Sequence, residues 1–149
     1  MKTRGKTKRN TNINNINKEN INSQAYTVFI PGNVPSSKNS KVWTGKFLVN
    51  SKTTQKYKKA TVEIFQDVAA KFRSYYDELP KPIKVNFKFI RGSKHKFDYI
   101  NPLQTIQDLM VDYEWIEDDN ADCLIPSFSP FEYDKANPGV LITILKDQS

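Results

Sequence analysis

The segment IKVNFKFIRGSKHKFDYINPLQTIQDLMVDYEWIEDD, residues 83–119, contains two hydrophobic periods in succession. Apolar and polar side chains alternate in its first part, IKVNFKF, which predicts a strand whose polar face is basic and solvated. Apolar residues then recur every three or four positions, which predicts a helix over about Pro102–Tyr113, with Asn101 as its N-cap. A strand that leads into an amphipathic helix is therefore the central unit of the predicted fold.

Apolar patterns on both sides of this unit supply the remaining elements. A longer helix is predicted from about Lys52 to Leu79, and its apolar stripe comprises Tyr57, Ala60, Ile64, Val68, Phe72, Tyr75 and Leu79. Further strands are predicted at 25–32, 122–128 and 138–146, and a small hairpin that turns at Thr44-Gly45 is predicted at 42–49. We therefore expect an α+β domain with a small mixed sheet of about four to five strands and two helices packed on it.

The domain organisation follows from composition. Residues 1–24 are rich in Asn and Lys and lack an apolar period, which predicts a disordered basic tail before a single domain at 25–149. The single Cys123 excludes an internal disulfide and is typical of a reduced, intracellular protein. We find neither the apolar core of a signal peptide nor a run of roughly 20 apolar residues. We therefore expect a cytoplasmic location and no membrane partner.

The charge of the chain is divided along the sequence. Residues 25–97 contain fifteen Lys or Arg and four Asp or Glu, whereas residues 98–149 contain two Lys and eleven Asp or Glu. Such a division is typical of a protein whose basic part binds a polyanion and whose acidic part binds a cation. Two charged faces that are merely solvated, or that pair with each other, explain the same pattern.

Four carboxylates are the candidate catalytic and metal-binding groups. Asp98 precedes the helix at 102–113, Asp108 lies within it, and Asp118 and Asp119 follow it. If residues 114–119 are extended, they span about 17–20 Å, which is enough to return along the helix and bring Asp119 beside Asp98. Converging carboxylates favour Mg²⁺ or Mn²⁺, and such a site can activate water against a phosphodiester. A solvated acidic turn is the alternative interpretation.

The order of these motifs resembles a known family. A basic strand, Asp-x-x-Asn, an amphipathic helix with an internal Asp and a Trp-Ile-Glu-Asp-Asp turn before a strand resemble the RusA family of Holliday junction resolvases. The resemblance covers about residues 25–146 and includes the Pro-Ser-Ser-Lys-Asn loop at 35–39. It implies a homodimeric, Mg²⁺-dependent endodeoxyribonuclease that acts on branched DNA in recombination or repair. It also implies that Asp98 and Asp119 bind the metal, helped by Asp118 or Asp108.

Two positions depart from the family pattern. Ile100 stands where the family has a second metal-binding Asp, and Gln104 stands where it has a catalytically important Lys. Asp118 or Asp108 is a candidate for the missing ligand, and the candidates for the missing cation are Lys94, Lys96 and Lys38. The alternative is a catalytically degenerate protein that only binds branched DNA. A third hypothesis, an unrelated interaction protein with a charged surface, requires the resemblance to be accidental.

The predicted DNA contacts combine lysines, aromatic rings and polar groups near the acidic segment. Lysines interleaved with Trp43 and Phe47 suit backbone contact and base stacking at an opened junction. The alternative is that these rings close the core of the hairpin and the lysines are solvated. His95 is a candidate for phosphate contact, with a solvated loop residue as the alternative. The full set of predicted DNA-binding residues is Lys38, Lys41, Lys46, Lys94, Lys96, Asn101 and Gln104.

Overall fold

A computed structural model describes residues 24–36 and 41–148 of the chain, and five strands of it form one mixed sheet. The strands of this sheet are β1 (Gln24–Pro31), β4 (Ile83–Arg91), β5 (Leu124–Phe128), β6 (Glu132–Tyr133) and β7 (Gly139–Leu145). Their order is β1-β7-β4-β5, and β6 pairs with the end of β4 beyond β5. The expected α+β class is confirmed, as are the strands predicted around β1, β4, β5 and β7; β6 was not predicted.

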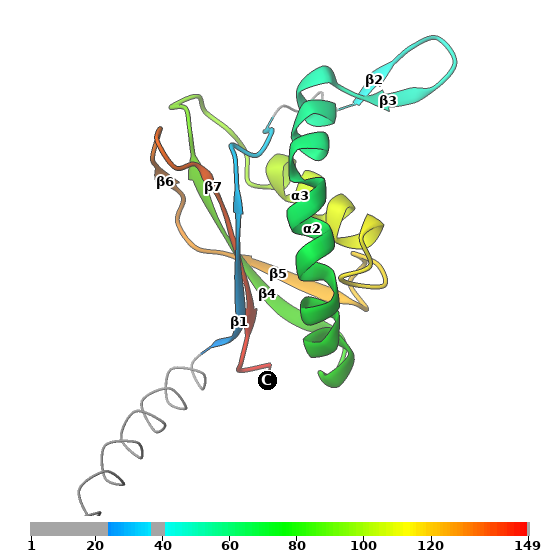
Figure 1. The fold of residues 1–149 in the computed structure, drawn as a ribbon, viewed down its shortest axis with the longest axis vertical. Coiled ribbons are helices and arrows are strands. Elements are labelled where there is room, and N and C mark those ends of the chain that lie inside the picture. The colour runs from blue at the N-terminus through cyan, green and yellow to red at the C-terminus, as the bar shows by residue number, and fades with distance from the viewer. Residues whose placement is uncertain (1–23, 37–40, 149) are drawn as a thin grey trace, which may run out of the picture.

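Two helices cover one side of this sheet (Figure 1). They are α2 (Lys52–Glu78) and α3 (Ile100–Asp112). Because α3 connects β4 to β5 and these two strands pair in parallel, the three elements form a βαβ unit. In such units, ligand sites form beyond the carboxyl ends of the strands. We therefore expect a ligand site at the loop that follows Arg91, at the end of β4.

The alternation predicted for β4 is present, but its polar face is less solvated than expected. The side chains of the predicted apolar face are fully buried in the core, and those between them are half-buried. Lys88 pairs with Glu132 at 2.8 Å, and the Asn86 side chain hydrogen-bonds with the hydroxyls of Ser127 and Ser129. Neighbouring side chains from β5 and β6 thus cover part of the basic face.

Helix α2 has the predicted length, and its predicted apolar stripe is confirmed in part. Tyr57 and Phe72 are buried, and Ile64, Val68, Tyr75 and Leu79 are partly buried and pack against the core, whereas Ala60 is exposed. The helix also buries Thr54, Thr61, Phe65 and Tyr76, and two of these are threonines, which an apolar pattern does not mark. The hydroxyl of Thr61 donates to the carbonyl of Tyr57 at 2.9 Å, so it can be buried without an unsatisfied donor.

Helix α3 begins earlier than the sequence indicated. Tyr99 is its N-cap residue and makes no side-chain capping hydrogen bond, so the prediction of Asn101 as the N-cap is wrong. The backbone N–H of Asn101 donates to the carbonyl of Asp98 at 3.1 Å, which places Asn101 inside the first turn. This shift brings Ile100 and Asn101 into the helix directly after Asp98.

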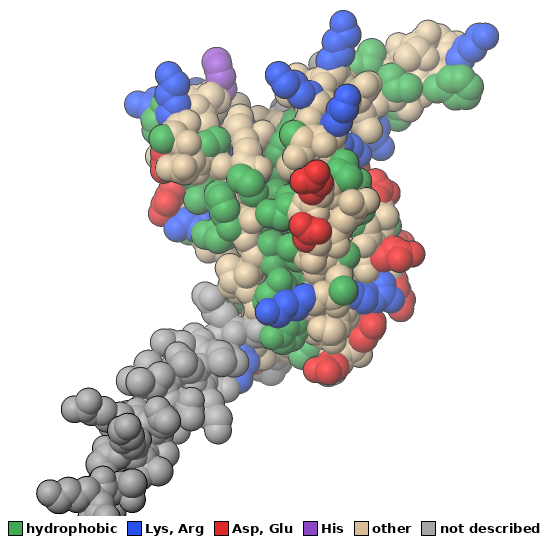
Figure 2. Space-filling view, in the orientation of Figure 1, with side chains coloured by type: hydrophobic (Ala, Val, Ile, Leu, Met, Phe, Trp, Pro, Cys, Tyr) green, Lys and Arg blue, Asp and Glu red, His purple; other side chains and the backbone are tan. Residues whose placement is uncertain are grey.

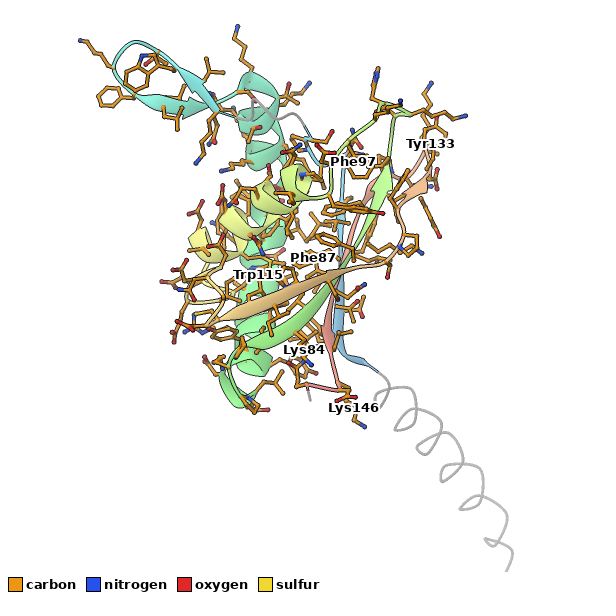
Figure 3. All side chains as sticks on the ribbon, turned by 180° about the vertical axis from the view of Figure 1, so that it is seen from behind. Lys84, Phe87, Phe97, Trp115, Tyr133 and Lys146 are labelled. Carbon is orange, nitrogen blue, oxygen red and sulfur yellow. The ribbon has the colours of Figure 1, made fainter. Side chains whose placement is uncertain are left out.

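The turn after α3 is anchored in the core by Trp115. The indole of Trp115 is fully buried, and its ring centroid lies 4.8 Å from that of Phe65 and 4.9 Å from that of Phe72. Its Nε1 donates to the carbonyl of Phe65 at 2.8 Å. Figure 3 places Trp115 with Phe87 in the centre of the molecule. Because Trp115 packs on Phe65 and Phe72, the chain turns toward α2 immediately after α3.

The predicted hairpin is present as β2 (Lys41–Trp43) and β3 (Leu48–Asn50), joined by a turn in which Gly45 has a φ of 93°. It projects beyond the beginning of α2 (Figure 1). Its apolar side chains do not close a core, because Trp43 is 65% exposed and Phe47 is 68% exposed. Neither described helix is long and apolar enough to cross a membrane. Residues 1–23 of the expected tail lie outside the described residues.

Candidate functional site

A row of polar side chains lies on the solvent-facing side of α3. Gln104 follows Asn101 by three residues and precedes Asp108 by four, so the three share one face of the helix. The amide Nε2 of Gln104 donates to Asp108 Oδ1 at 2.8 Å and to Asp119 Oδ2 at 3.4 Å. One neutral amide therefore holds two carboxylates that come from different segments.

Asp119 contacts α3 at Gln104, one turn beyond the start of the helix. The predicted approach of Asp119 to Asp98 stays a prediction. The prediction assumed an extended return, but residues 113–121 form tight turns in which Glu114 has a φ of 62°. Trp115 and Ile116 are buried in the core, so the segment 114–119 spans a shorter distance along α3 than an extended segment would.

Asp118 is engaged in its own turn. Its Oδ1 accepts the backbone N–H of Asp119 at 2.8 Å, and its Oδ2 accepts the side chain of Asn120 at 3.0 Å. The backbone N–H of Asp119 and then the Asn120 amide hold the pKa of the Asp118 carboxyl below its usual range, because both hydrogen bonds favour the ionised form. Asp118 thus shapes the turn that presents Asp119.

Asp98 lies in a separate pocket of about 940 Å³ at the carboxyl end of β4. This pocket is lined by Ser36, Ser93, Lys94, His95, Lys96, Phe97, Asp98, Asn101, Phe131 and Tyr133. Figure 3 shows Phe97 and Tyr133 at the same end of the molecule, opposite Lys84 and Lys146. Asn101 lies on the wall of this pocket and one turn before Gln104, so it connects Asp98 with the pair formed by Asp108 and Asp119.

The two positions that depart from the family pattern differ in their surroundings. Ile100 is 72% exposed at the start of α3, so an apolar side chain stands in solvent beside Asp98. Gln104 contacts the two carboxylates that a lysine at this position would pair with. A lysine at position 104 would place a positive charge beside these two carboxylates, whereas the amide of Gln104 is neutral.

The predicted basic contacts gather at one end of the molecule. Lys41, exposed on β2, lines a pocket of about 480 Å³ together with Lys58, Asp108 and Asp112, while Lys94 and Lys96 line the pocket of Asp98. Figure 2 shows Lys and Arg side chains concentrated at the hairpin end and acidic side chains along the flank of the helices. Lys46 is exposed in the hairpin turn, and Lys38 lies outside the described residues.

The sequence analysis missed one functional candidate, Arg91. It is only 3% exposed, although it is charged, and it lies at the carboxyl end of β4 between the candidate site and the start of α2. Burial lowers the pKa of its guanidinium from the ordinary value. The signal was present in the strand pattern, because Arg91 continues the series of inward-facing positions from Ile83 to Phe89.

The residues on α3 and in the following turn fit a magnesium ion in donor type. Mg²⁺ in proteins is often held by one or two carboxylates together with waters and substrate phosphates, and Asp108 and Asp119 supply two converging carboxylates. Among residues 24–36 and 41–148, no group of three or more His, Cys, Asp or Glu side chains is arranged to hold a metal ion. Asp98 and Asp118 are therefore not gathered with Asp108 and Asp119 into a single cluster.

Comparison of the sequence with protein-family models and with curated proteins gives no match.

Proposed function

We propose that the chain is a metal-dependent endodeoxyribonuclease that acts on branched DNA, including four-way junctions. The observation that carries this proposal is the convergence of Asp108 and Asp119 on Gln104, between two pockets that contain lysines. A metal ion held by carboxylates beside a basic, phosphate-attracting surface is an arrangement that supports phosphodiester hydrolysis.

The basic end of the molecule supports the DNA-binding part of the proposal. Lys41 and Lys46 lie in the hairpin and neutralise backbone phosphates, while Trp43 and Phe47 expose ring faces on which unpaired bases stack. Lys94 and Lys96 position the strand that enters the pocket of Asp98. Because a four-way junction has two-fold symmetry, two copies of the chain are needed to incise both strands, and the acting form is a homodimer.

The residues of α3, Asp98 and the turn after α3 have different roles in the proposed reaction. Asp108 and Asp119 hold a Mg²⁺ or Mn²⁺ ion, which supplies charge neutralisation and lowers the pKa of water. Gln104 positions Asp108 and Asp119, the amide of Asn101 donates to a phosphate oxygen, and Asp98, in the adjacent pocket, accepts the proton of the attacking water. Asp118 keeps Asp119 in place through the turn that both residues form.

A second candidate function is branched-DNA binding without cleavage. It is favoured by Ile100 and by Gln104, because neither side chain supplies charge where the resembling family has an ionisable residue. The amide of Gln104 also donates hydrogen bonds to Asp108 and Asp119, which reduces the repulsion between the two carboxylates. In a nuclease, a bound metal ion would reduce this repulsion. Under this alternative the basic end binds DNA and the carboxylates are structural.

The experiment that separates the two functions is cleavage of a labelled four-way junction against a linear duplex of the same sequence. It is carried out with Mg²⁺, with Mn²⁺ and with EDTA, and binding is measured in parallel by mobility shift. Symmetric nicking of the junction that requires metal and is lost in Asp119→Asn and Asp108→Asn supports the nuclease. Asp122→Asn is the matched control, because it removes the same charge from an exposed side chain of the same turn.

Tight junction binding without nicking in either metal rejects the nuclease and leaves the binding protein. Equal binding of junction and linear duplex rejects the structural selectivity that both candidates share. Absence of binding rejects both candidates.

A further inference from the structure

A further pocket of about 320 Å³ lies beside the pocket of Asp98. Its lining residues are Asn33, Pro35, Ser36, Ser51, Thr53, Arg91, Ser93 and His95. Apart from Pro35, their side chains carry hydroxyl, amide, imidazole or guanidinium groups, and no described lining residue is acidic. A pocket that is rich in donors and lacks carboxylates is suited to an anion.

Arg91 gives this pocket a positive charge that the protein does not neutralise. Its guanidinium donates to the carbonyl of Val34 at 2.7 Å and to the hydroxyl of Ser36 at 2.9 Å, and it lies 4.6 Å from the ring centroid of Phe97. Its Nε is buried without a hydrogen-bond partner, and no carboxylate within residues 24–36 and 41–148 forms an ion pair with it. A buried cation is costly unless an opposite charge accompanies it.

The first turn of α2 contributes a second positive feature on the opposite wall. Ser51 is the N-cap of this 27-residue helix and accepts the backbone N–H of Thr54 at 3.3 Å. The first backbone N–H groups of a helix have no partner within the helix, and the helix dipole makes this end positive. The first turn of α2 contains no acidic residue, so no side chain of that turn neutralises this end.

We propose that this pocket, formed by Arg91, Ser93, His95 and the first turn of α2, binds a phosphate group. The backbone N–H groups at Lys52 and Thr53 and the hydroxyls of Thr53 and Ser93 donate to the phosphate oxygens, and Arg91 supplies the balancing charge. That the phosphate belongs to the DNA backbone rests on the function proposed above; the phosphate site itself does not.

The position of the pocket explains its use in DNA binding. It shares Ser36, Ser93 and His95 with the pocket of Asp98, so the two pockets are contiguous. A nucleic-acid strand whose reacting phosphate lies beside Asp98 therefore has a neighbouring phosphate within reach of α2. Holding that neighbour fixes the register of the strand without reading its sequence.

The test uses inorganic phosphate as the probe and a carboxylate placed in the pocket as the perturbation. Thr53→Glu puts an anion at the helix terminus, where it competes with phosphate and is compatible with the helix dipole. Gln66→Glu is the matched control, because it adds the same charge to an exposed side chain of the same helix that lines neither this pocket nor the two described above. Neither variant removes a core contact, so both are expected to fold.

The first measurement is thermal unfolding of the full chain in phosphate and in chloride at equal ionic strength, with amide NMR shifts recorded in parallel. Phosphate should raise the Tm of the wild type and of Gln66→Glu and should move the amide signals of Lys52, Thr53 and Ser93. In Thr53→Glu the affinity for phosphate should fall at least about tenfold. Equal Tm values in the two salts together with unmoved signals at these amides overturn the site.

The second measurement identifies the source of the phosphate. Duplex and junction affinities are measured against salt concentration for Thr53→Glu and Gln66→Glu. A lower affinity and a slope smaller by about one unit for Thr53→Glu alone support a DNA phosphate in the pocket. Equal slopes for the two variants, with phosphate binding lost only in Thr53→Glu, overturn the DNA source. Because neither measurement depends on cleavage, a failed nuclease assay leaves this test intact.

Discussion

Gln104 Nε2 and Asp119 Oδ2 lie 3.4 Å apart although fifteen residues separate them in the sequence. The contact joins α3 to the turn that follows it, and Asp108 shares the same amide at 2.8 Å. A neutral donor thus stands between two carboxylates at the centre of the candidate site. Both the nuclease proposal and its non-catalytic alternative depend on what happens to this contact when a cation is present.

The two tryptophans should differ sharply in their effects on stability. Trp115→Phe removes the hydrogen bond from the indole Nε1 to the carbonyl of Phe65 and part of a fully buried ring, so we expect a loss of about 2 kcal/mol in the free energy of unfolding. Trp43→Phe changes a ring that is 65% exposed and should alter this free energy by less than about 0.5 kcal/mol. Urea denaturation measures both, and equal losses contradict the account of the core.

The exposed rings of the hairpin should contribute to DNA binding and not to folding. We expect Trp43→Ala and Phe47→Ala each to weaken junction binding by about tenfold, since stacking of one base on an aromatic ring contributes about 1–3 kcal/mol. Leu48→Ala is the control, because Leu48 is similarly exposed, at 61%, but offers no ring. Titration of labelled junction DNA measures the three affinities. A loss for Leu48→Ala as large as for the two rings would indicate general apolar contact instead of stacking.

Gly139 should tolerate no side chain. A Cβ at this position would lie 2.4 Å from the ring of Phe29 and 2.6 Å from the backbone carbonyl oxygen of Ile30, where β7 pairs with β1. We expect Gly139→Ala to lower the free energy of unfolding by about 2–3 kcal/mol. Gly92→Ala meets Pro138 at 3.3 Å and should cost no more than about 1 kcal/mol. Thermal and urea unfolding of the two variants give the comparison, and similar costs contradict the packing described for β1 and β7.

Asp118 should stabilise the protein in a pH-dependent way. Its folded-state pKa lies below the ordinary value of 3.8, so its contribution is fully present above that value and is lost as the pH falls through the lower folded-state pKa. Asp118→Asn should therefore be less stable than the wild type at neutral pH, and the difference should shrink as the solution is acidified below about pH 4. The urea midpoints of Asp118→Asn and of the wild type at several pH values measure this difference in stability. A difference that stays constant with pH would show that the charge of Asp118 is not what holds the turn.

The sequence predicted the elements better than their termini and faces. Alternation in β4 and the length of α2 were readable because apolar side chains mark them directly. The predicted stripe of α2 correctly included Tyr57 and Phe72, but it omitted Thr54 and Thr61, which take core positions that an apolar pattern does not mark. Asn101 looked like an N-cap from its residue type, yet the hydrogen bond from its N–H to Asp98 lies within the helical turn.

The candidate site was predictable in its members but not in its grouping. Asp108 and Asp119 were both named, and the spacing of Gln104 and Asp108 places them on one helix face, but no local pattern shows that Asp119 contacts the same amide. The effect of the burial of Trp115 on the following turn depends on three-dimensional packing. The pocket around Arg91 combines residues from four distant segments, so no local pattern marks it.

The most direct test of the central claim is titration of the full chain with Mn²⁺ while amide NMR signals are followed. If Asp108 and Asp119 hold the metal, the signals of residues 104–108 and 118–120 should broaden first, and Mg²⁺ should reverse the broadening. Asp119→Asn should abolish the effect, and Asp122→Asn should retain it. Broadening that is equal in Asp119→Asn and the wild type, or absent around Gln104, would contradict a metal site at these carboxylates.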